Sequence, residues 1–327
     1  MIAVMIIPTG LGFSIGGDAG DGNPACKLLA ECCDTLITHP NVVNASDINE
    51  MQRNVLYVEG SCLDRFLEGH RDLWPVNILS NRILLLANKP VQTDTVDAAN
   101  AARHTIGCSI TVLPLETPLI MEGWVDCSRA HGKVSGLNEL IKQIEPYLDA
   151  YDTIAIHSKI DVDVELIKRY FNAEVGVNPW GKVEAMVSSA VSKATNLMCA
   201  HAPMENNPDL ILEHVPARMA AEAISTTYLQ CVLKGLHRAP HLVPVGYRNA
   251  IHVSEVDCMI SPVGCWGEAH KACREHRIPI IGVNNNRPRV KQPLPNPFDY
   301  IVANYVEAAG LLMAMRAGVT AGDLREN

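Results

Sequence analysis

The chain has 327 residues, a length suited to one large α/β domain or to about two domains of ordinary size. Hydrophobic residues make up 48% of the chain and aromatic residues only 5%, so aliphatic side chains fill most of the core, as is typical of parallel sheets covered by helices. The formal net charge of −9, with no run of basic residues, excludes a protein that neutralises nucleic-acid phosphates.

Strand and helix patterns alternate through the first part of the chain. The N-terminal run MIAVMIIP predicts a strand, because it is broken at Pro8 and lacks a basic leader. A glycine-rich loop follows, and Asn23 and Pro24 have the pattern of a helix start. Further strands are predicted over NVLYVEG, NRILLLAN and CSITVLPLE, and a helix over TDTVDAANAARHTIG. No apolar stretch reaches the roughly 18 residues of a membrane span, so we expect no membrane partner.

The same alternation resumes after a less regular segment. Thr117–Gly136 has no clean period, and we expect a long functional loop or a crossing between lobes there. Helices are then predicted over SGLNELIKQIEPYLD, VDVELIKRYF, GKVEAMVSSAVSKATN and ARMAAEAISTTYLQCVLKGL. The clearest strand–helix–strand unit is VDCMISPVG, CWGEAHKACREH and IPIIGVNN. A last strand and helix follow, with Asn304 as the helix cap.

End-to-end alternation predicts a Rossmann-like α/β fold, in which mainly parallel strands carry helices on both faces, in one or two lobes. A two-lobe division gives an N-terminal lobe with the glycine-rich loop, residues 1–135, and a C-terminal lobe with the Cys/His motifs, residues 136–327. Carboxyl ends of parallel strands share one edge, where open α/β sheets bind their ligands. That edge is expected to gather His39, His157, Cys199, His201 and Cys265.

The leading candidate for catalysis is Cys265. It follows a predicted strand and stands at the predicted start of a helix, where the helix dipole lowers a thiol pKa and favours the nucleophilic thiolate. Glu268 lies in the same turn and can serve as acid or base. Cys199 and His201 lie two residues apart, so on a strand they point to the same face and can oppose Cys265. The alternative is that these cysteines are small buried residues.

Substrate-binding residues are expected on the glycine-rich loop and at the strand ends. Backbone N–H groups at Gly10, Gly12, Gly16 and Gly17 can face an anionic group, although the loop matches neither a dinucleotide fingerprint nor a Walker motif. Glycine-loop flexibility is the alternative explanation. Polar side chains that can orient or hydrogen-bond a substrate are His39, Asn41, Asn44, His157 and Asn284.

A metal site is the alternative role for the histidines. His39, His157 and His201 have the donor atoms for a divalent metal, and Asp18 or Asp21 would lie near its bound water. With the cysteine mechanism, no cofactor is expected.

Several segments together resemble a family of uncharacterised proteins common in cyanobacteria and their plastid relatives. The segments are IIPTGLG, GGDAGDGNP, THPNVVNASD, NPWGKVEAMVS, CAHAPM and PVGCWGEA, and the resemblance covers nearly the whole chain. It implies no catalytic residues. A looser resemblance is to the aspartate/glutamate racemase group, whose two α/β lobes each offer a cysteine after a strand, and here Cys199 and Cys265 match.

These observations predict an enzyme that acts on a small polar, carboxylate-bearing metabolite by cysteine-assisted acid/base or covalent catalysis, of the isomerase/racemase, lyase or hydrolase type. The alternatives are a metal-dependent hydrolase and a non-catalytic metabolite-binding protein. The eleven scattered cysteines form no CxxC pair, which predicts free thiols and a cytoplasmic location. Broad apolar stripes on the Ala-rich helices predict a homo-oligomer.

Overall fold

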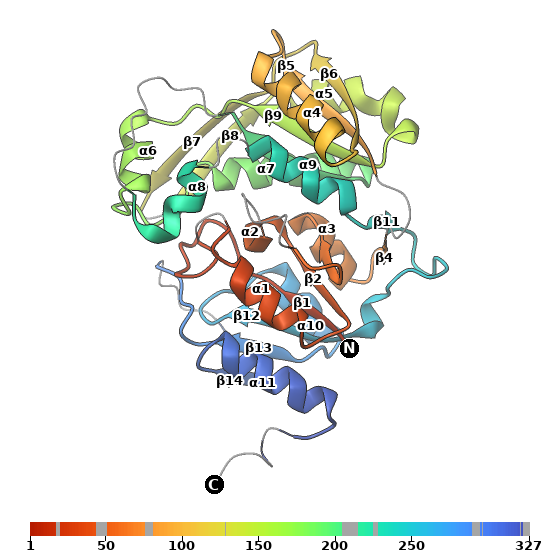
Figure 1. Ribbon diagram of the computed structural model, residues 1–327, viewed down its shortest axis with the longest axis vertical. Coiled ribbons are helices and arrows are strands. Elements are labelled where there is room, and N and C mark those ends of the chain that lie inside the picture. Colours follow the sequence, from red (N-terminus) through yellow and green to blue (C-terminus); the bar gives the residue numbers. More distant parts are fainter. Residues whose placement is uncertain are drawn as a thin grey trace.

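Two parallel β-sheets, each with helices on both faces, organise the chain (Figure 1). The computed structural model describes residues 1–17, 20–43, 51–75, 81–127, 129–204, 215–224, 228–289, 295, 297–320 and 322. The predicted Rossmann-like α/β fold with parallel sheets is confirmed. No helix in these ranges is long and apolar enough to cross a membrane.

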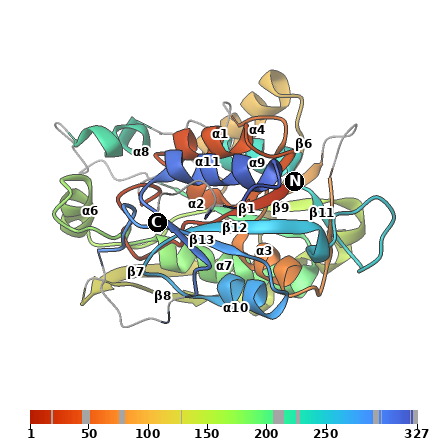
Figure 2. The same cartoon turned by 90° about the horizontal axis from the view of Figure 1, so that it is seen from below.

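The first sheet has the strand order β14-β13-β12-β1-β2-β3, and all its neighbouring strands are parallel. Its strands are β1 (Ile2–Met5), β2 (Thr35–Thr38), β3 (Val55–Tyr57), β12 (Val256–Pro262), β13 (Ile280–Val283) and β14 (Tyr300–Val302). Helices α1 (Asn23–Ala30) and α11 (Tyr305–Arg316) cover one face, and α3 (Gly60–Leu67) and α10 (Glu268–Glu275) cover the other (Figure 2). The inner strands are apolar because both of their faces are buried. The short helix α2 (Pro40–Val43) follows β2.

The second sheet has the order β10-β9-β5-β6 and is also parallel. Its strands are β5 (Arg82–Asn88), β6 (Ser109–Leu115), β9 (Thr153–Ser158) and β10 (Met198–Pro203). Alternate strand residues belong to two different cores: Ile83 and Leu85 pack with α4 (Thr93–Thr105) and α9 (Tyr228–Arg238), whereas Leu84 and Leu86 pack with α5 (Leu137–Ile144) and α7 (Gly181–Thr195). Figure 1 shows α7 and α9 between the two sheets, and α7 contacts α3.

Smaller elements join these layers. They are the hairpin of β7 (Ile120–Asp126) and β8 (Arg129–Ser135), the strand pair β4 (Asp72–Trp74) and β11 (His241–Val243), helices α6 (Val164–Phe171) and α8 (Ala220–Ile224), and the 3-10 turns η2 (Glu145–Ala150), η3 (Ala217–Met219) and η4 (Val253–Glu255). The sequence predicted a long loop or a crossing between lobes over residues 117–136, and this prediction is wrong because the β7–β8 hairpin occupies most of that segment. Its pattern was hard to recognise because Gly123 and Gly132 interrupt the alternation, and Gly132 packs directly on Val183 of α7.

Two further expectations from the sequence are wrong. The boundary at residue 135 does not separate the sheets, since β9 and β10 join β5 and β6, while β12 joins β1. Parallel strands are linked by crossovers, so strands far apart in sequence can become neighbours and the first lobe is discontinuous. The helix expected to close near Gly235 begins with the 3-10 turn η3 and ends at Arg238 in α9, so Gly235 lies inside α9, where the ring of Tyr57 packs against it.

Each sheet contains a point at which the strand order reverses. In the first sheet the chain runs from β1 toward β3 on one side and from β12 toward β14 on the other. In the second sheet the reversal lies between β5 and β9. Ligands of open α/β sheets bind in the crevice outside the carboxyl ends of strands at such points, so a ligand site is expected there.

Candidate functional site

We call the first sheet with its helices the first lobe and the second sheet with its helices the second lobe. A cleft lies between the two lobes, outside the carboxyl ends of β1, β2 and β3. Its wider part, here called the groove, has a volume of about 760 Å³. One wall is a single stripe of α7, in which Lys182 and Lys193 flank small or apolar residues over about 16 Å of helix. The other walls come from the β1 end and from the starts of α3 and α10: Ile6, Pro8, Thr9, His39, Glu59, Gly60, Ser61, Leu63, Asp64 and Trp266–His270.

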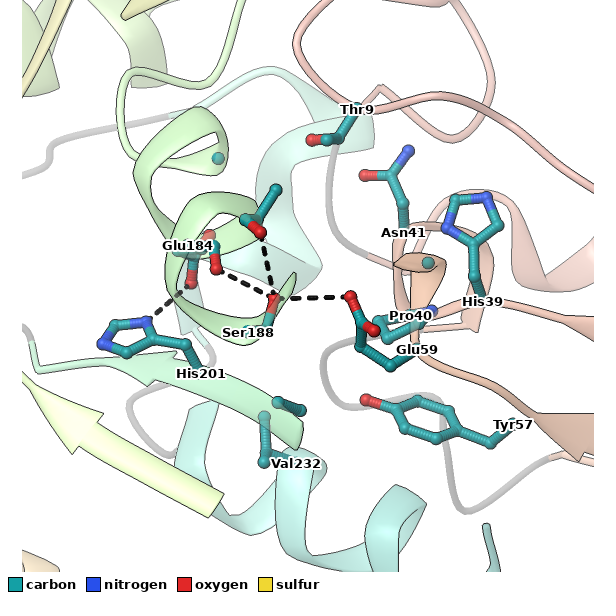
Figure 3. Close-up of a pocket in the computed structure, with 14 residues that line it drawn as sticks. Thr9, His39, Pro40, Asn41, Tyr57, Glu59, Glu184, Ser188, His201 and Val232 are labelled. Carbon is teal, nitrogen blue, oxygen red and sulfur yellow. Dashed lines mark hydrogen bonds and ion pairs between the residues drawn. The ribbon is translucent and has the colours of Figure 1, made fainter. Parts of the chain in front are cut away.

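A narrower extension of the cleft, here called the annex, has a volume of about 150 Å³ (Figure 3). Thr9, His39, Glu59, Gly60 and Ala185 line both parts, so the groove and the annex are continuous. The remaining annex residues are Pro40, Asn41, Tyr57, Gly181, Glu184, Ser188, Ala200, His201 and Val232. Figure 3 shows Ser188 of α7 facing Glu59 across this space, whereas Glu184 of the same helix is directed toward His201.

The second lobe contributes a hydrogen-bonded chain of three polar side chains. The Nδ1 atom of His201, on β10, lies 3.3 Å from Oε1 of Glu184 on α7, and its Nε2 atom lies 3.1 Å from Oγ of Ser158 at the end of β9. Glu184 and His201 line the annex and Ser158 is buried behind them. His201 was predicted from the sequence, whereas Glu184 and Ser158 were not.

The first lobe contributes a buried carboxylate. Glu59 follows β3 and caps α3: its Oε2 atom accepts from the backbone N–H groups of Ser61 and Cys62, at 3.1 and 3.2 Å, and from the Ser61 hydroxyl at 2.6 Å. Its Oε1 atom faces Ser188 of α7 at 3.5 Å. Sequence reasoning missed Glu59, because glutamate is not among the residues that usually cap helix N-termini. Its position directly after a predicted strand was the available signal.

His39 and Asn41, both predicted from the sequence, line the annex. The Nε2 atom of His39 accepts a hydrogen bond from the backbone N–H of Ile7 at 3.0 Å, which places the proton on Nδ1. Burial lowers the pKa of His39 to about 4, so the ring is neutral at pH 7 and keeps an N–H donor. The amide of Asn41 donates to the carbonyls of Ile7 and Gly16, at 2.6 and 2.9 Å. Asn41 therefore holds the glycine-rich loop beside the site.

The predicted glycines line neither the groove nor the annex, and three of the four are tightly packed. Gly12 has φ +65°, and a Cβ there would lie 2.0 Å from the carbonyl oxygen of Gly176. Gly17 and Gly16 are similarly close to Phe13 and Ile7, whereas Gly10 faces open space at φ +77°. The N–H of Gly16 is bound by Asp21, which also pairs with Arg218.

The three asparagines of the loop regions have different outcomes. Asn44 lies outside the described residues, as does Asp18. Asn284 follows β13 away from the cleft, and its side chain accepts from Arg287. Its neighbour Asn286, which the sequence also offers as a substrate-binding amide, is buried and binds Ser14, Ile15 and Tyr305, so it anchors the glycine-rich loop.

The expectation that Cys265 is an activated thiol is wrong. Cys265 is 1% exposed, its Sγ atom lies 3.0 Å from the Pro262 carbonyl and 3.7 Å from Nε2 of His270, and burial raises its pKa to about 11. Helix α10 begins only at Glu268, so the helix dipole acts too far away to overcome burial. Cys199 is 0% exposed, and burial also raises its pKa. Glu268 is exposed at the groove and pairs with Lys271 at 2.6 Å.

The three histidines proposed as metal ligands are not brought together in the structure. His201 pairs with Ile156 in the sheet register, so His157 points to the opposite face, where its Nδ1 atom lies 2.8 Å from Oγ1 of Thr95. Burial lowers the pKa of His157 to about 4. Across the described ranges, no three His, Cys, Asp or Glu side chains are grouped so that they could hold a metal ion.

Comparison with known proteins identifies the family. The family DUF3326, described as a protein of unknown function, matches residues 2–325, and the chain belongs to it. A protein of Synechococcus sp. named an uncharacterized lipoprotein is 34% identical over 340 residues, which cover 98% of this chain and 92% of that protein. The family resemblance expected from the sequence is confirmed, and the looser one to the racemase group gains no support from these matches.

Proposed function

We propose that this DUF3326 protein is an enzyme that acts on a small polar, carboxylate-bearing metabolite by acid/base catalysis between its lobes, of the isomerase/racemase, lyase or hydrolase type. One observation carries the proposal: the hydrogen-bonded pair of Glu184 and His201 lines the small annex together with His39 of the other lobe. Acid and base groups that line one small cavity can move a proton onto and off a bound carbon or oxygen.

Each side chain has a role set by its hydrogen bonds. Glu184, a lining residue of the annex, takes or gives the proton, while His201, held by Ser158, orients its carboxylate. Neutral His39 donates its Nδ1 hydrogen to an oxygen on which negative charge develops. Lys182, on the same stripe of α7 at the mouth of the annex, attracts the substrate carboxylate.

The acid/base version of the proposal is favoured over cysteine catalysis. Catalysis by Cys265 or Cys199 needs a thiolate, and the raised pKa of each buried thiol keeps it protonated near pH 7. Neither thiol lines the groove or the annex.

A cytoplasmic homo-oligomer is part of the proposal. All eleven cysteines are free and ten are buried, which suits a reducing compartment. The exposed apolar side chains Tyr300 and Ile301 of edge strand β14 and Val306 and Met313 of α11 support contact with a second copy. The Synechococcus relative carries the name lipoprotein, so cell fractionation is the direct check. Recovery in the membrane fraction would contradict the cytoplasmic location.

The proposal is tested by proton NMR in D₂O. The purified protein is incubated with a panel of 2-oxo, 2-hydroxy and 2-amino acids, and we expect at least one member to lose a C–H signal or to give product signals. Glu184→Gln should slow that change by about 10²-fold or more. Glu165→Gln, on the exposed surface of α6, is the matched control and Cys265→Ser should remain active.

Full activity of Glu184→Gln would refute the assigned base, and loss of activity in Cys265→Ser alone would restore the cysteine mechanism. Saturable binding of a panel member without any chemical change would instead identify a non-catalytic metabolite-binding protein that uses the same cleft.

A further inference from the structure

We infer that the annex binds a primary ammonium group, so that the metabolite taken by this protein is an amino-carboxylate. The inference rests on the proposed function, whose annex and groove it uses, and it names the substrate class. It is carried by two buried oxygen atoms, Oε1 of Glu59 and the hydroxyl of Tyr57, that lack good partners in the described part of the chain.

The charged side chains that line the annex determine which end of a ligand can bind there. Glu59 and Glu184 both line the annex, and no lysine or arginine of the described ranges lines it with them. His39 is neutral at pH 7, because burial lowers its pKa to about 4. Glu184 is paired with His201 at 3.3 Å, whereas no cationic side chain of the described ranges pairs with Glu59, so the Glu59 carboxylate favours a cation and repels a second anion in this small cavity. A carboxylate of the ligand therefore belongs in the groove, and its positive group belongs in the annex.

Glu59 is buried, with an exposed fraction of 6%. Its Oε2 atom is fully used by the cap of α3. Its Oε1 atom has only the Ser188 hydroxyl, at 3.5 Å, and that hydroxyl has a nearer acceptor in the backbone carbonyl of Glu184 at 2.9 Å. A hydroxyl has one hydrogen to donate, so Oε1 of Glu59 lacks a strong donor. A charged N–H donor from a ligand would meet that need.

Tyr57 is the last residue of β3. The side chain is 1% exposed, and within the described ranges no protein group hydrogen-bonds to its hydroxyl. Figure 3 shows this hydroxyl pointing into the annex beside Glu59. The ring cannot easily turn away, since it packs on Gly235 of α9 so closely that a Cβ there would lie 2.7 Å from its Cζ atom.

A primary ammonium group matches this set of acceptors. It carries three N–H donors and no acceptor, and the annex offers Oε1 of Glu59 and the Tyr57 oxygen beside it. The carboxylate of the same ligand then points outward to Lys182, because Ala185, one turn along α7, lines both the annex and the groove. A simple carboxylic acid would leave Glu59 and Tyr57 without partners.

Isothermal titration calorimetry with matched ligand pairs tests the inference. The probes are L- and D-amino acids and the 2-hydroxy acids of the same skeletons, so that each pair differs in one ammonium group. We expect an amino acid to bind about tenfold or more tightly than its 2-hydroxy counterpart, equivalent to about 1.4 kcal/mol. Glu59→Gln and Tyr57→Phe should each remove most of that preference, and Glu165→Gln should keep it.

The outcomes separate the inference from the proposed function. Equal binding of both members of a pair overturns the ammonium site while leaving a carboxylate-binding cleft in place. Loss of the preference in Glu59→Gln alone, with Tyr57→Phe unchanged, overturns the role of the tyrosine. Absence of binding by every probe overturns the inference and the proposed substrate class together. Circular dichroism of each variant shows that the comparison is made on folded protein.

Discussion

Replacing Tyr57 by Phe is expected to stabilise the ligand-free protein while weakening its binding of amino-carboxylates. The substitution removes one hydroxyl oxygen and leaves the packing of the ring on Gly235 unchanged. A buried polar group without a partner costs about 1–3 kcal/mol of folding free energy, and this hydroxyl has no protein partner in the described ranges. We therefore expect the free energy of unfolding to rise by about 1–3 kcal/mol.

Tyr305→Phe is the matched control, because it makes the same chemical change at a tyrosine whose hydroxyl is used. The side-chain amide of Asn286 donates to that hydroxyl at 2.9 Å, in a site that is also buried. Loss of one satisfied hydrogen bond should lower the free energy of unfolding by about 1 kcal/mol. The two substitutions should thus change stability in opposite directions.

Urea unfolding followed by circular dichroism, without added ligand, measures both effects. The reasoning about Tyr57 would be refuted if Tyr57→Phe lost as much stability as Tyr305→Phe, since that would mean that its hydroxyl is already well bonded in the free protein. Calorimetry on the same samples should show the more stable variant to be the weaker binder of amino acids.

Three further predictions concern packing, pH and thiols. Gly12→Ala should cost about 1–2 kcal/mol for its positive φ and about 1–3 kcal/mol more for its clash, whereas Gly10→Ala should cost only the first amount; equal losses in urea unfolding would contradict this. Burial raises the pKa of Asp64 from 3.8 to about 7 in the folded protein. Between these two pKa values the folded protein holds a proton that the unfolded chain has lost, so the free energy of unfolding falls as the pH rises from about 4 to about 7. Asp64→Asn should therefore match the parent near pH 4 and become progressively more stable up to pH 7.5, by at most about 1.4 kcal/mol per pH unit, and a difference independent of pH would be inconsistent with it. Iodoacetamide should label exposed Cys127 in the native protein and Cys265 only after unfolding, with early labelling of Cys265 as the opposing result by mass spectrometry.

The sequence predicted part of the site. Alternation of apolar runs with helical patterns predicts parallel strands with ligands at their carboxyl ends, and His39 and His201 do line one cleft. The single strand edge expected for them is wrong, because His39 follows β2 of the first sheet and His201 lies on β10 of the second. The same rule misplaced His157, because side chains alternate across a strand and the register with β10 sends this one to the opposite face. Strand register depends on the neighbouring strand and cannot be read from one segment alone.

Other parts of the site depend on tertiary contacts. Glu184 and Ser188 lie on α7, a helix of the second lobe, and reach the cleft only because the lobes pack face to face. Cys265 has the local sequence of an activated thiol, and only the folded chain shows that burial outweighs the helix dipole there. From the sequence, Tyr57 is an ordinary core residue of a strand. Only the folded chain shows that α9 holds its ring in place, with the hydroxyl beside Glu59.

A crystal structure of the protein with its best-binding carboxylate from the NMR panel would test the central claim most directly. We expect the ligand to bridge the annex and the groove, with its reacting carbon within about 3.5 Å of the Glu184 carboxylate. A ligand bound outside this cleft, or seated against Cys265 with Glu184 out of reach, would contradict it.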